Sequence, residues 1–165
     1  MAYLLDANVF IQAKNLHYGF DFCPAFWDWL IASNESQHVF SIEKVGDEVQ
    51  AINDELSEWA AARGVGFFLP LEPTVIPSLT VVSSWAANGG RYEAGAVTGF
   101  LQVADYYLVA CAHAGRHTVV THEVHSESRK KIKIPDACIG LGIRFMTPYE
   151  MLRSERARFL LGPQP

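Results

Sequence analysis

The sequence is poor in charge, poor in cysteine and free of long apolar segments, and each shortage excludes a class of protein. Only 19% of the 165 residues are charged and half are hydrophobic, which excludes the composition of a disordered chain. No apolar run approaches the roughly 18 residues of a membrane-spanning helix, and the N-terminus lacks the basic and apolar regions of a signal peptide. We therefore predict a folded cytoplasmic protein with no membrane segment.

The cysteines and the net charge argue against two further classes of protein, namely disulfide-rich proteins and proteins that coat nucleic acid. Cys23, Cys111 and Cys138 are odd in number and far apart, which argues against a disulfide framework, and we expect three core thiols. The 18 acidic and 13 basic residues give a net charge of -5, which taken alone argues against a protein that coats nucleic acid. The length favours one domain over residues 1–165.

Short apolar segments alternate with helical patterns along the chain. Strands are expected at 2–5, 39–40, 117–121 and 144–146, and helices at 24–31, 42–59, 79–87, 92–101, 104–114 and 148–160. We expect Ser41 to cap the helix 42–59, and Gly115 to end the helix 104–114 in the left-handed conformation. Residues 67–79 are interpreted as a connector. The alternation is typical of an α/β protein with helices on both faces of the sheet.

Four acidic residues fall where such a sheet places functional groups, at the carboxyl ends of its strands. Asp6 directly follows the first strand, and Glu123 follows the strand 117–121 by two residues. Asp105 begins the helix 104–114. A helical projection of residues 42–59 puts Glu48 on the border of the apolar stripe, facing inward.

Each acid also has an ordinary structural interpretation. Asp6 could form a turn or cap a helix, and Glu48 could be a boundary residue paired with a lysine. Asp105 could stabilise a helix dipole, and Glu123 could lie in a solvated loop. The coincidence favours a site, because all four positions point to one edge of one sheet.

The residues around these acids resemble the motifs of the PIN-domain nucleases. Four motifs are in register over nearly the whole chain, namely 3–10 with Asp6, Ser41 followed by the helix with Glu48, 104–110 with Asp105, and 119–123 with Glu123. Within that family the chain is similar to VapC-like proteins, to which segments 18–24 and 131–136 are particular. The resemblance implies a PIN-like three-layer α/β/α sandwich with a central, mostly parallel sheet.

The resemblance also implies a function. PIN-domain proteins of this type are metal-dependent endoribonucleases, commonly the toxin of a toxin–antitoxin pair, so RNA is the expected substrate and an antitoxin protein the expected partner. Small PIN proteins commonly form homodimers. Carried over residue by residue, the metal ligands and catalytic residues are Asp6, Glu48, Asp105 and Glu123. The fourth position is usually Asp, and the further acid often found two residues on is replaced by His125.

The chemistry of phosphodiester hydrolysis fits this acid cluster. A hard divalent ion such as Mg²⁺ or Mn²⁺ supplies both the nucleophilic water and the stabilisation of charge on oxygen. One ion would be held by two or three of the acids, and a second could arrive with the substrate phosphate. Asn8 and Thr121 are candidates to orient a metal-bound water or an acid. Asp136 is a candidate fifth carboxylate, or a plain helix start.

An RNA substrate also needs a positive surface near the acids. The only basic run is Arg129, Lys130 and Lys131 with Lys133, which follows Glu123 and which we expect to bind RNA, although short charge runs are often solvated loops.

Several aromatic residues are candidates for contacts with RNA or with another chain. Tyr18, Phe20 and Phe22 could stack on bases, but core packing is expected for at least two of them. Trp59 and Trp85 are candidate exposed aromatics at an interface.

Other chemistries fit the sequence less well. The spacing of His122, Glu123 and His125 is one residue short of the zinc-binding His-Glu-x-x-His pattern. Cys111 lies in an apolar helix, where a structural thiol is usual. The rival from another class is a catalytically inactive PIN-fold module that binds RNA or a protein partner.

Overall fold

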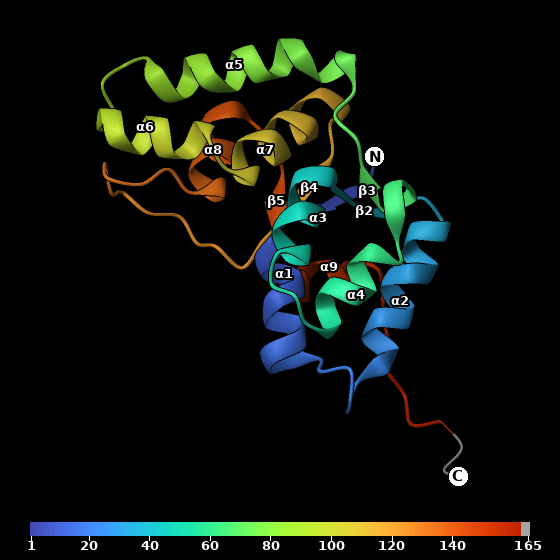
Figure 1. Ribbon diagram of the computed structural model, residues 1–165. Coiled ribbons are helices and arrows are strands. Elements are labelled where there is room, and N and C mark those ends of the chain that lie inside the picture. Colours follow the sequence, from blue (N-terminus) through green and yellow to red (C-terminus); the bar gives the residue numbers. More distant parts are fainter. Residues whose placement is uncertain (163–165) are drawn as a thin grey trace.

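A parallel β-sheet forms the centre of the computed structural model, which describes residues 1–162 (Figure 1). Its strand order is β3-β2-β1-β4-β5, and every neighbouring pair is parallel. The strands are β1 (Tyr3–Leu5), β2 (Val39–Ile42), β3 (Phe68–Leu69), β4 (Thr118–Val120) and β5 (Phe145–Met146). The central strands are buried and apolar, as expected for a sheet covered on both faces.

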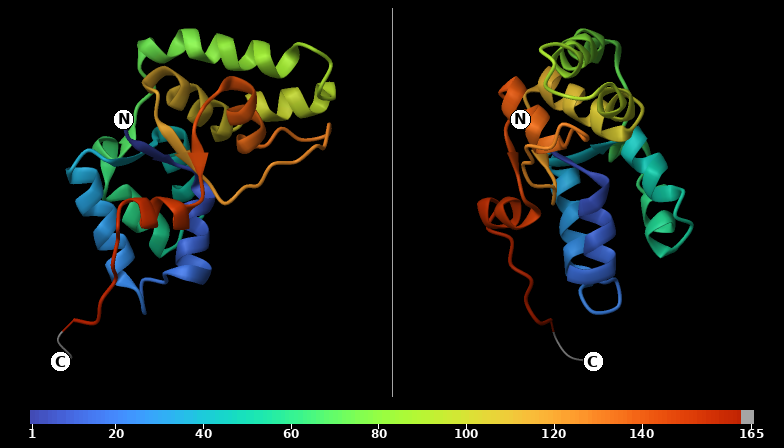
Figure 2. Two further views of the ribbon diagram at one scale, coloured as in Figure 1. Left: turned by 180° about the vertical axis from the view of Figure 1, so that it is seen from behind. Right: turned by 90° about the vertical axis from the view of Figure 1, so that its left-hand side faces the viewer.

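Helices cover both faces of the sheet, so the predicted three-layer α/β/α sandwich is confirmed (Figures 1 and 2). In Figure 1, α5, α6, α7 and α8 lie above the sheet, and α1, α2 and α9 lie below it. The helices are α1 (Ala7–Gln12), α2 (Pro24–Glu35), α3 (Glu43–Gln50), α4 (Glu55–Ala61), α5 (Ile76–Ala87), α6 (Ala94–Leu101), α7 (Ala104–Gly115), α8 (Ile134–Leu141) and α9 (Pro148–Ser154), with shorter turns η1 (Ala13–His17), η2 (Gly64–Gly66) and η3 (Pro73–Val75). Residues 163–165 of the expected single domain lie outside the described part.

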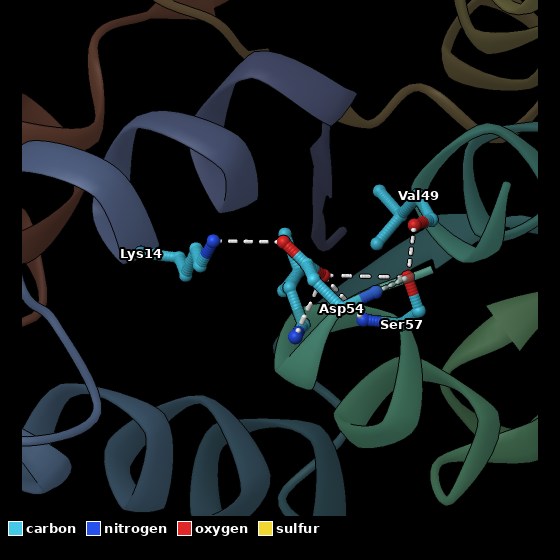
Figure 3. A network of polar contacts seen from close by, with 5 residues as sticks. Lys14, Val49, Asp54 and Ser57 are labelled. Carbon is cyan, nitrogen blue, oxygen red and sulfur yellow. Dashed lines mark hydrogen bonds and ion pairs between the residues drawn. The ribbon is translucent and has the colours of Figure 1, made fainter. Parts of the chain in front are cut away.

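The predicted helix 42–59 is two helices, α3 and α4, because residues 51–54 leave the helical path. Asn53 has a positive φ of 60°, and Asp54 is the N-cap of α4, where its Oδ1 accepts from the backbone N–H groups of Leu56 at 3.0 Å and Ser57 at 3.1 Å. Figure 3 shows that Lys14, in the turn η1 that follows α1, also reaches Asp54 and pairs with its Oδ2 at 2.8 Å. The periodicity of apolar residues continues through this break, which is why the sequence pattern missed it.

Ser41 is not a helix cap. It lies inside β2, fully buried, and its hydroxyl donates to the backbone carbonyl of Leu5 in β1 at 2.6 Å. The hydroxyl therefore links two central strands.

The segment 67–79 is more than a connector. Phe68 and Leu69 form β3, which pairs in parallel with Ser41 and Ile42 of β2 and makes the edge of the sheet. The helix after it begins at Ile76 rather than at residue 79, because Pro77 occupies the first turn, where a missing N–H costs nothing.

Two helix ends differ from their predicted forms. In α7 the left-handed residue is Arg116, with φ 54°, and not Gly115. A Cβ on Gly115 would overlap the imidazole of His117, so this glycine is needed for a close approach rather than for its φ. The last helix, α9, ends at Ser154 instead of near residue 160, and Arg156 follows with φ 53°.

The cysteines are free thiols, and only one of them lies fully in the core. Cys138 is buried, which raises the pKa of its thiol to about 12. Cys111 and Cys23 are half-buried, so the expected core position is wrong for these two. Burial also raises the pKa of Cys111 to about 11, which keeps that thiol protonated.

Most of the singled-out aromatic residues belong to the packing of the fold. Tyr18 stacks on Phe26 with ring centroids 4.4 Å apart, and Phe20 stacks on Trp27 at 4.1 Å, whereas Phe22 is 66% exposed. This confirms that at least two of the three pack internally.

The two candidate interface tryptophans are half-buried rather than exposed. Trp59 packs against Phe10 and Phe67, and Trp85 packs against Tyr92.

Among residues 1–162, no single helix is both long enough and apolar enough to cross a membrane. The pair α6 and α7, bent by 72°, meets those two criteria only when the helices are taken together.

Candidate functional site

Acidic side chains gather at the carboxyl edge of the sheet. Asp6 directly follows β1, is only 6% exposed and stands at the start of α1. Asp105 is half-buried in the first turn of α7. Glu123 follows β4, which is the neighbour of β1 in the sheet. The parallel arrangement therefore brings together residues that are more than a hundred positions apart in the sequence.

The acids at this edge repel one another. Burial raises the pKa of Asp6 to about 7, and the negative charges of Asp105 and Glu123 add to the effect. Burial also raises the pKa of Asp105 to about 6, with further contributions from Glu123 and Glu48. Asp105 is thus coupled to Glu48 and Glu123, and Asp6 to Asp105 and Glu123.

Glu48 is exposed and lies next to the buried face of α3 rather than on it. The buried face of α3 consists of Val45, Gly46 and Val49. Gly46 packs so closely on Phe68 that a Cβ would lie 3.0 Å from the ring, so this glycine is part of the buried face. A projection that counts only apolar side chains does not register a buried glycine. Glu48 still reaches the site, because it lines a pocket together with Asp105.

A hydrogen-bond network around Thr121 holds Asp6 in place. Leu5 pairs with Val120, so Thr121 stands beside Asp6 at the ends of the two strands. The Thr121 hydroxyl donates to Oδ2 of Asp6 at 2.8 Å and accepts from Nδ2 of Asn8 at 3.2 Å. It also accepts from the backbone N–H of Glu123 at 3.1 Å.

Asn8 closes this network onto the chain after β4. Its Oδ1 accepts from the backbone N–H of His122 at 3.1 Å, while its amide donates to Thr121. The buried Thr121 hydroxyl therefore uses its one proton on the acid, and Asn8 acts on Asp6 through Thr121.

The carboxylate of Glu123 already has partners. Its Oε2 accepts from the backbone N–H of Ile134 at 2.8 Å, at the start of α8, and its Oε1 lies 4.0 Å from Nζ of Lys131. Glu123 thus holds both ends of the loop that joins β4 to α8.

Asp136 has a structural role in the same loop. Its Oδ1 accepts from the backbone N–H of Ser126 at 3.0 Å and lies 2.7 Å from Nδ1 of His125, and its Oδ2 accepts from the backbone N–H of Lys133 at 3.3 Å. Asp136 is buried and belongs to the start of α8. The structure therefore favours the helix-start interpretation over that of a fifth carboxylate in the site.

A pocket of about 410 Å³ opens beside the acids. Glu48 and Asp105 line it, and Lys130 and Lys131 come from the loop after β4. One wall is α6, which sequence reasoning missed, and its lining residues are Gly95, Ala96, Gly99 and Phe100. The two glycines four residues apart in a helix were the available signal for a surface open to close approach.

The other two predicted basic residues lie elsewhere in the loop. Arg129 donates from its guanidinium to the carbonyl of Gly90 at 2.8 Å, and its own carbonyl accepts from the N–H of Glu93 at 2.9 Å. Arg129 therefore fastens the loop to the turn before α6. Lys133 is half-buried next to α8.

The donor set at this edge suits a hard divalent cation, since it consists of carboxylate oxygens whose charges are not fully compensated. As the side chains stand, no three Asp, Glu, His or Cys residues within 1–162 are arranged to hold a metal ion. The Glu48 carboxylate forms no hydrogen bond or ion pair with another residue of that range. The site therefore fits such an ion in chemical type, and a rotation of the exposed Glu48 side chain would be part of binding.

The fold and the site together define an α/β protein with acids at the carboxyl edge of a parallel sheet, beside a pocket that two acids and two lysines line. Residues 3–159 match the family model described as a domain of unknown function (DUF4411), and the chain belongs to this family. No curated protein and no solved structure matches the chain.

Proposed function

We propose that the protein is a Mg²⁺- or Mn²⁺-dependent endoribonuclease of the PIN-domain type, which hydrolyses phosphodiester bonds of RNA in the cytoplasm. The observation that carries the proposal is the repulsion that Asp6 and Asp105 feel at one sheet edge, from each other or from the nearby Glu123 and Glu48. A cluster of partly buried acids is costly to ionise without a cation, and a divalent ion would remove that cost.

Each residue of the site has a separate role in the proposed reaction. Asp6, Glu48 and Asp105 would hold the ion, which when bound supplies an activated water and charge stabilisation at the phosphate. Thr121 keeps the Asp6 carboxylate oriented through the 2.8 Å hydrogen bond. Lys131 attracts the phosphate backbone to the mouth of the pocket, where its ammonium group partly offsets the charge of Asp105.

Lys131 lies between the expected substrate phosphate and the carboxylate of Glu123. Its Nζ lies 4.0 Å from the Glu123 carboxylate, at a distance that a bound phosphate or metal ion would change. Glu123 is one methylene longer than Asp and remains tied to Ile134, so it contributes to the site through its charge or through a water molecule.

The proposal includes the role of a toxin that is neutralised by an antitoxin protein. This part rests on the resemblance of the chain to the VapC-like proteins, to which segments 18–24 and 131–136 are particular. Induction of the wild-type protein in a bacterial host is expected to arrest growth, and induction of the Asp6→Asn variant is not.

A second candidate function is a catalytically inactive module that binds RNA or a protein partner. One observation favours it, namely that Glu123 is engaged by Ile134 and Lys131 while no three acids within 1–162 form a ready metal cage. The two candidate functions differ in their need for Asp6. The nuclease needs its buried carboxylate to hold the metal ion, whereas a module that only binds does not.

Cleavage of a pool of cellular RNA separates the two functions. The wild-type protein is expected to cleave RNA with Mg²⁺ or Mn²⁺, to stop in EDTA, and to lose at least about a hundredfold in rate with Asp6→Asn, since a direct metal ligand is removed. Asp47→Asn is the matched control, because Asp47 is an exposed acid of α3 outside the pocket.

The outcomes are distinct. Cleavage that persists in EDTA, or full activity of the Asp6→Asn variant, would reject the metal-dependent nuclease. RNA binding without cleavage, unchanged by Asp6→Asn, would support the inactive module.

A further inference from the structure

A second pocket lies at the opposite edge of the sheet, where β4 and β5 begin. It measures about 350 Å³, and residues from the ends of α7 and α8 form it. Two arginines and two histidines line it, namely Arg116, Arg144, His113 and His117, together with the apolar Leu141 and Ile143. None of its lining residues, all of which belong to the described range 1–162, is acidic. Such a lining is unusual in a chain with a net charge of -5.

The two arginines of this pocket are not used in ion pairs. Within residues 1–162, neither Arg116 nor Arg144 pairs with an acidic side chain. Both are exposed, and Arg144 contacts the sulfur of Met1. Arg116 and Arg144 both line this cavity, although Arg144 also lines a neighbouring pocket with Met1. Each guanidinium can donate two parallel hydrogen bonds to phosphate or carboxylate oxygens, so the pair suits an anion.

The backbone next to Arg116 leaves room for the ring of His117. Gly115 has no side chain, so the imidazole of His117 can lie against it. The left-handed residue that ends α7 is then Arg116, at φ 54°, and the N–H of His117 closes the motif on the carbonyl of Ala112 at 3.0 Å. The left-handed conformation strains arginine but not glycine. The backbone of Arg116 would therefore favour glycine at this position, and only the arginine side chain can give a reason for arginine.

His117 adds an uncharged donor. Its Nδ1 accepts from the backbone N–H of Ala2 at 3.1 Å, because Tyr3 pairs with Thr118 and so places Ala2 beside His117. Burial lowers the pKa of His117, so the ring is neutral near pH 7 and its proton is on Nε2. The remaining histidine, His113, is bonded through Nδ1 to the hydroxyl of Ser78 at 2.8 Å.

We propose that this pocket binds a small phosphomonoester. A phosphomonoester carries close to two negative charges at neutral pH, which two arginines match better than a singly charged diester. The volume is in the range of small-molecule sites, and Leu141 and Ile143 provide an apolar wall for the organic part of the ligand. The site is at the opposite edge of the sheet from the acids and is independent of the nuclease proposal.

Isothermal titration with ribose 5-phosphate tests the site, in EDTA and at constant ionic strength. We expect saturable binding of one molecule per chain, and none of unphosphorylated ribose. Arg116→Gly and Arg144→Gln are each expected to weaken binding by about tenfold or more, since each removes charge-assisted hydrogen bonds.

Arg156→Gly is the matched control. Arg156 is also a left-handed arginine after a helix, with φ 53° and the N–H of Ala157 closing on the carbonyl of Leu152 at 2.9 Å, but it does not line the pocket. Both Arg→Gly variants are expected to keep or raise the melting temperature, because glycine accepts the left-handed conformation. Only Arg116→Gly is expected to lose affinity.

The outcomes separate a binding site from an ordinary role of arginine at a helix end. Equal weakening by Arg116→Gly and Arg156→Gly, or no saturable binding of the phosphorylated sugar in the millimolar range, would overturn the proposal. Loss of affinity in a well-folded Arg116→Gly protein would support it, because a role in offsetting the helix dipole alone would affect only stability.

A second arm identifies the source of the phosphate group. A short RNA with a 5′-phosphate presents the same chemistry as the free sugar phosphate. Binding that requires the 5′-phosphate and is lost in Arg116→Gly would assign the pocket to RNA ends, whereas tighter binding of ribose 5-phosphate would assign it to a free metabolite. Either result supports a phosphomonoester site.

Discussion

At Asp6, burial and hydrogen bonding act on the carboxyl group in opposite directions. Burial and the charges of Asp105 and Glu123 favour the protonated form, whereas the Thr121 hydroxyl favours the ionised form. Burial is the largest of these effects, so the pKa rises to about 7 from a model-compound value of 3.8. The metal-free protein therefore stores an unfavourable charge at this residue above neutral pH.

The raised pKa gives a prediction about stability and pH. The folded state binds the Asp6 proton more tightly than the unfolded state, so its contribution to stability is present below pH 3.8 and is lost as the pH rises to about 7. In EDTA, Asp6→Asn is expected to become more stable than the wild type over this window, by about 1.4 kcal/mol per pH unit. Denaturant unfolding at several pH values measures the difference.

The control for this measurement is Asp47→Asn, an exposed acid of α3, for which we expect no such trend. A difference between Asp6→Asn and the wild type that does not vary with pH would show that the Asp6 carboxyl is not perturbed.

The Thr121 hydroxyl is a second residue whose contribution to stability can be measured. Thr121→Val keeps the shape but removes a buried hydroxyl that bonds to Asp6, Asn8 and Glu123. The groups left without a partner are expected to cost about 1–3 kcal/mol of stability. Thr118→Val is the matched control, because Thr118 is a buried residue of β4, the strand that Thr121 follows. Its side chain donates no hydrogen bond within 1–162, so its variant should change stability by under about 1 kcal/mol. Equal losses in the two variants would refute a special role of Thr121.

Among the elements, the break between α3 and α4 depends on Asp54. Its carboxylate caps α4 and pairs with Lys14, which ties η1 to the start of α4 (Figure 3). Ser57 adds a hydroxyl that donates to the carbonyl of Val49 at 3.0 Å and so joins α4 to α3. One acid and one serine thus hold three helices at the junction.

Asp54→Ala is expected to destabilise the protein by about 1 kcal/mol, the usual cost of removing an N-cap. Lys14 lowers the pKa of Asp54, so the contribution of this carboxylate is present above its usual pKa near 3.8 and is lost as the pH falls through the lower value of the folded state. Thermal unfolding of Asp54→Ala beside Asp47→Ala measures the effect. Similar melting temperatures for the two variants would contradict the capping role.

The elements also show where sequence patterns are informative. Helix α2 begins at Pro24 as predicted, because the proline signal is local. By contrast, β3 has two residues, too few for any periodicity, and Gly46 is buried only because Phe68 packs on it. After α7, Gly115 lies against the ring of His117, and that ring is held by a tertiary contact, its hydrogen bond with the backbone N–H of Ala2.

On the scale of the whole molecule, the acids and the cations occupy separate places. The carboxyl edge of the sheet carries the repelling acids with Lys130 and Lys131 at the pocket mouth, and the opposite edge carries Arg116 and Arg144. Net charge therefore says little about binding of RNA or phosphate by this protein, since local charge decides both.

A divalent ion is expected to stabilise the entire fold. Ions that bind only the folded state raise stability with concentration, by about 2.7 kcal/mol at a hundred times the dissociation constant, which corresponds to several degrees in melting temperature. We expect Mg²⁺ or Mn²⁺ in a millimolar titration to raise the melting temperature of the wild type, but not that of an Asp6→Asn, Asp105→Asn double variant. An unchanged wild-type melting temperature would contradict a metal site at these acids.

The sequence by itself determined the α/β class, the parallel sheet and the four acids at one of its edges, because strand and helix signals and strand ends are local properties of the chain. Only the tertiary structure decided that Asp6 stands beside Thr121, since this requires β1 to pair with β4 in one register. It also decided that Glu48 is exposed, that Asp136 serves the loop and that two arginines share a pocket. Those outcomes depend on contacts between segments far apart in the chain, which no local pattern records.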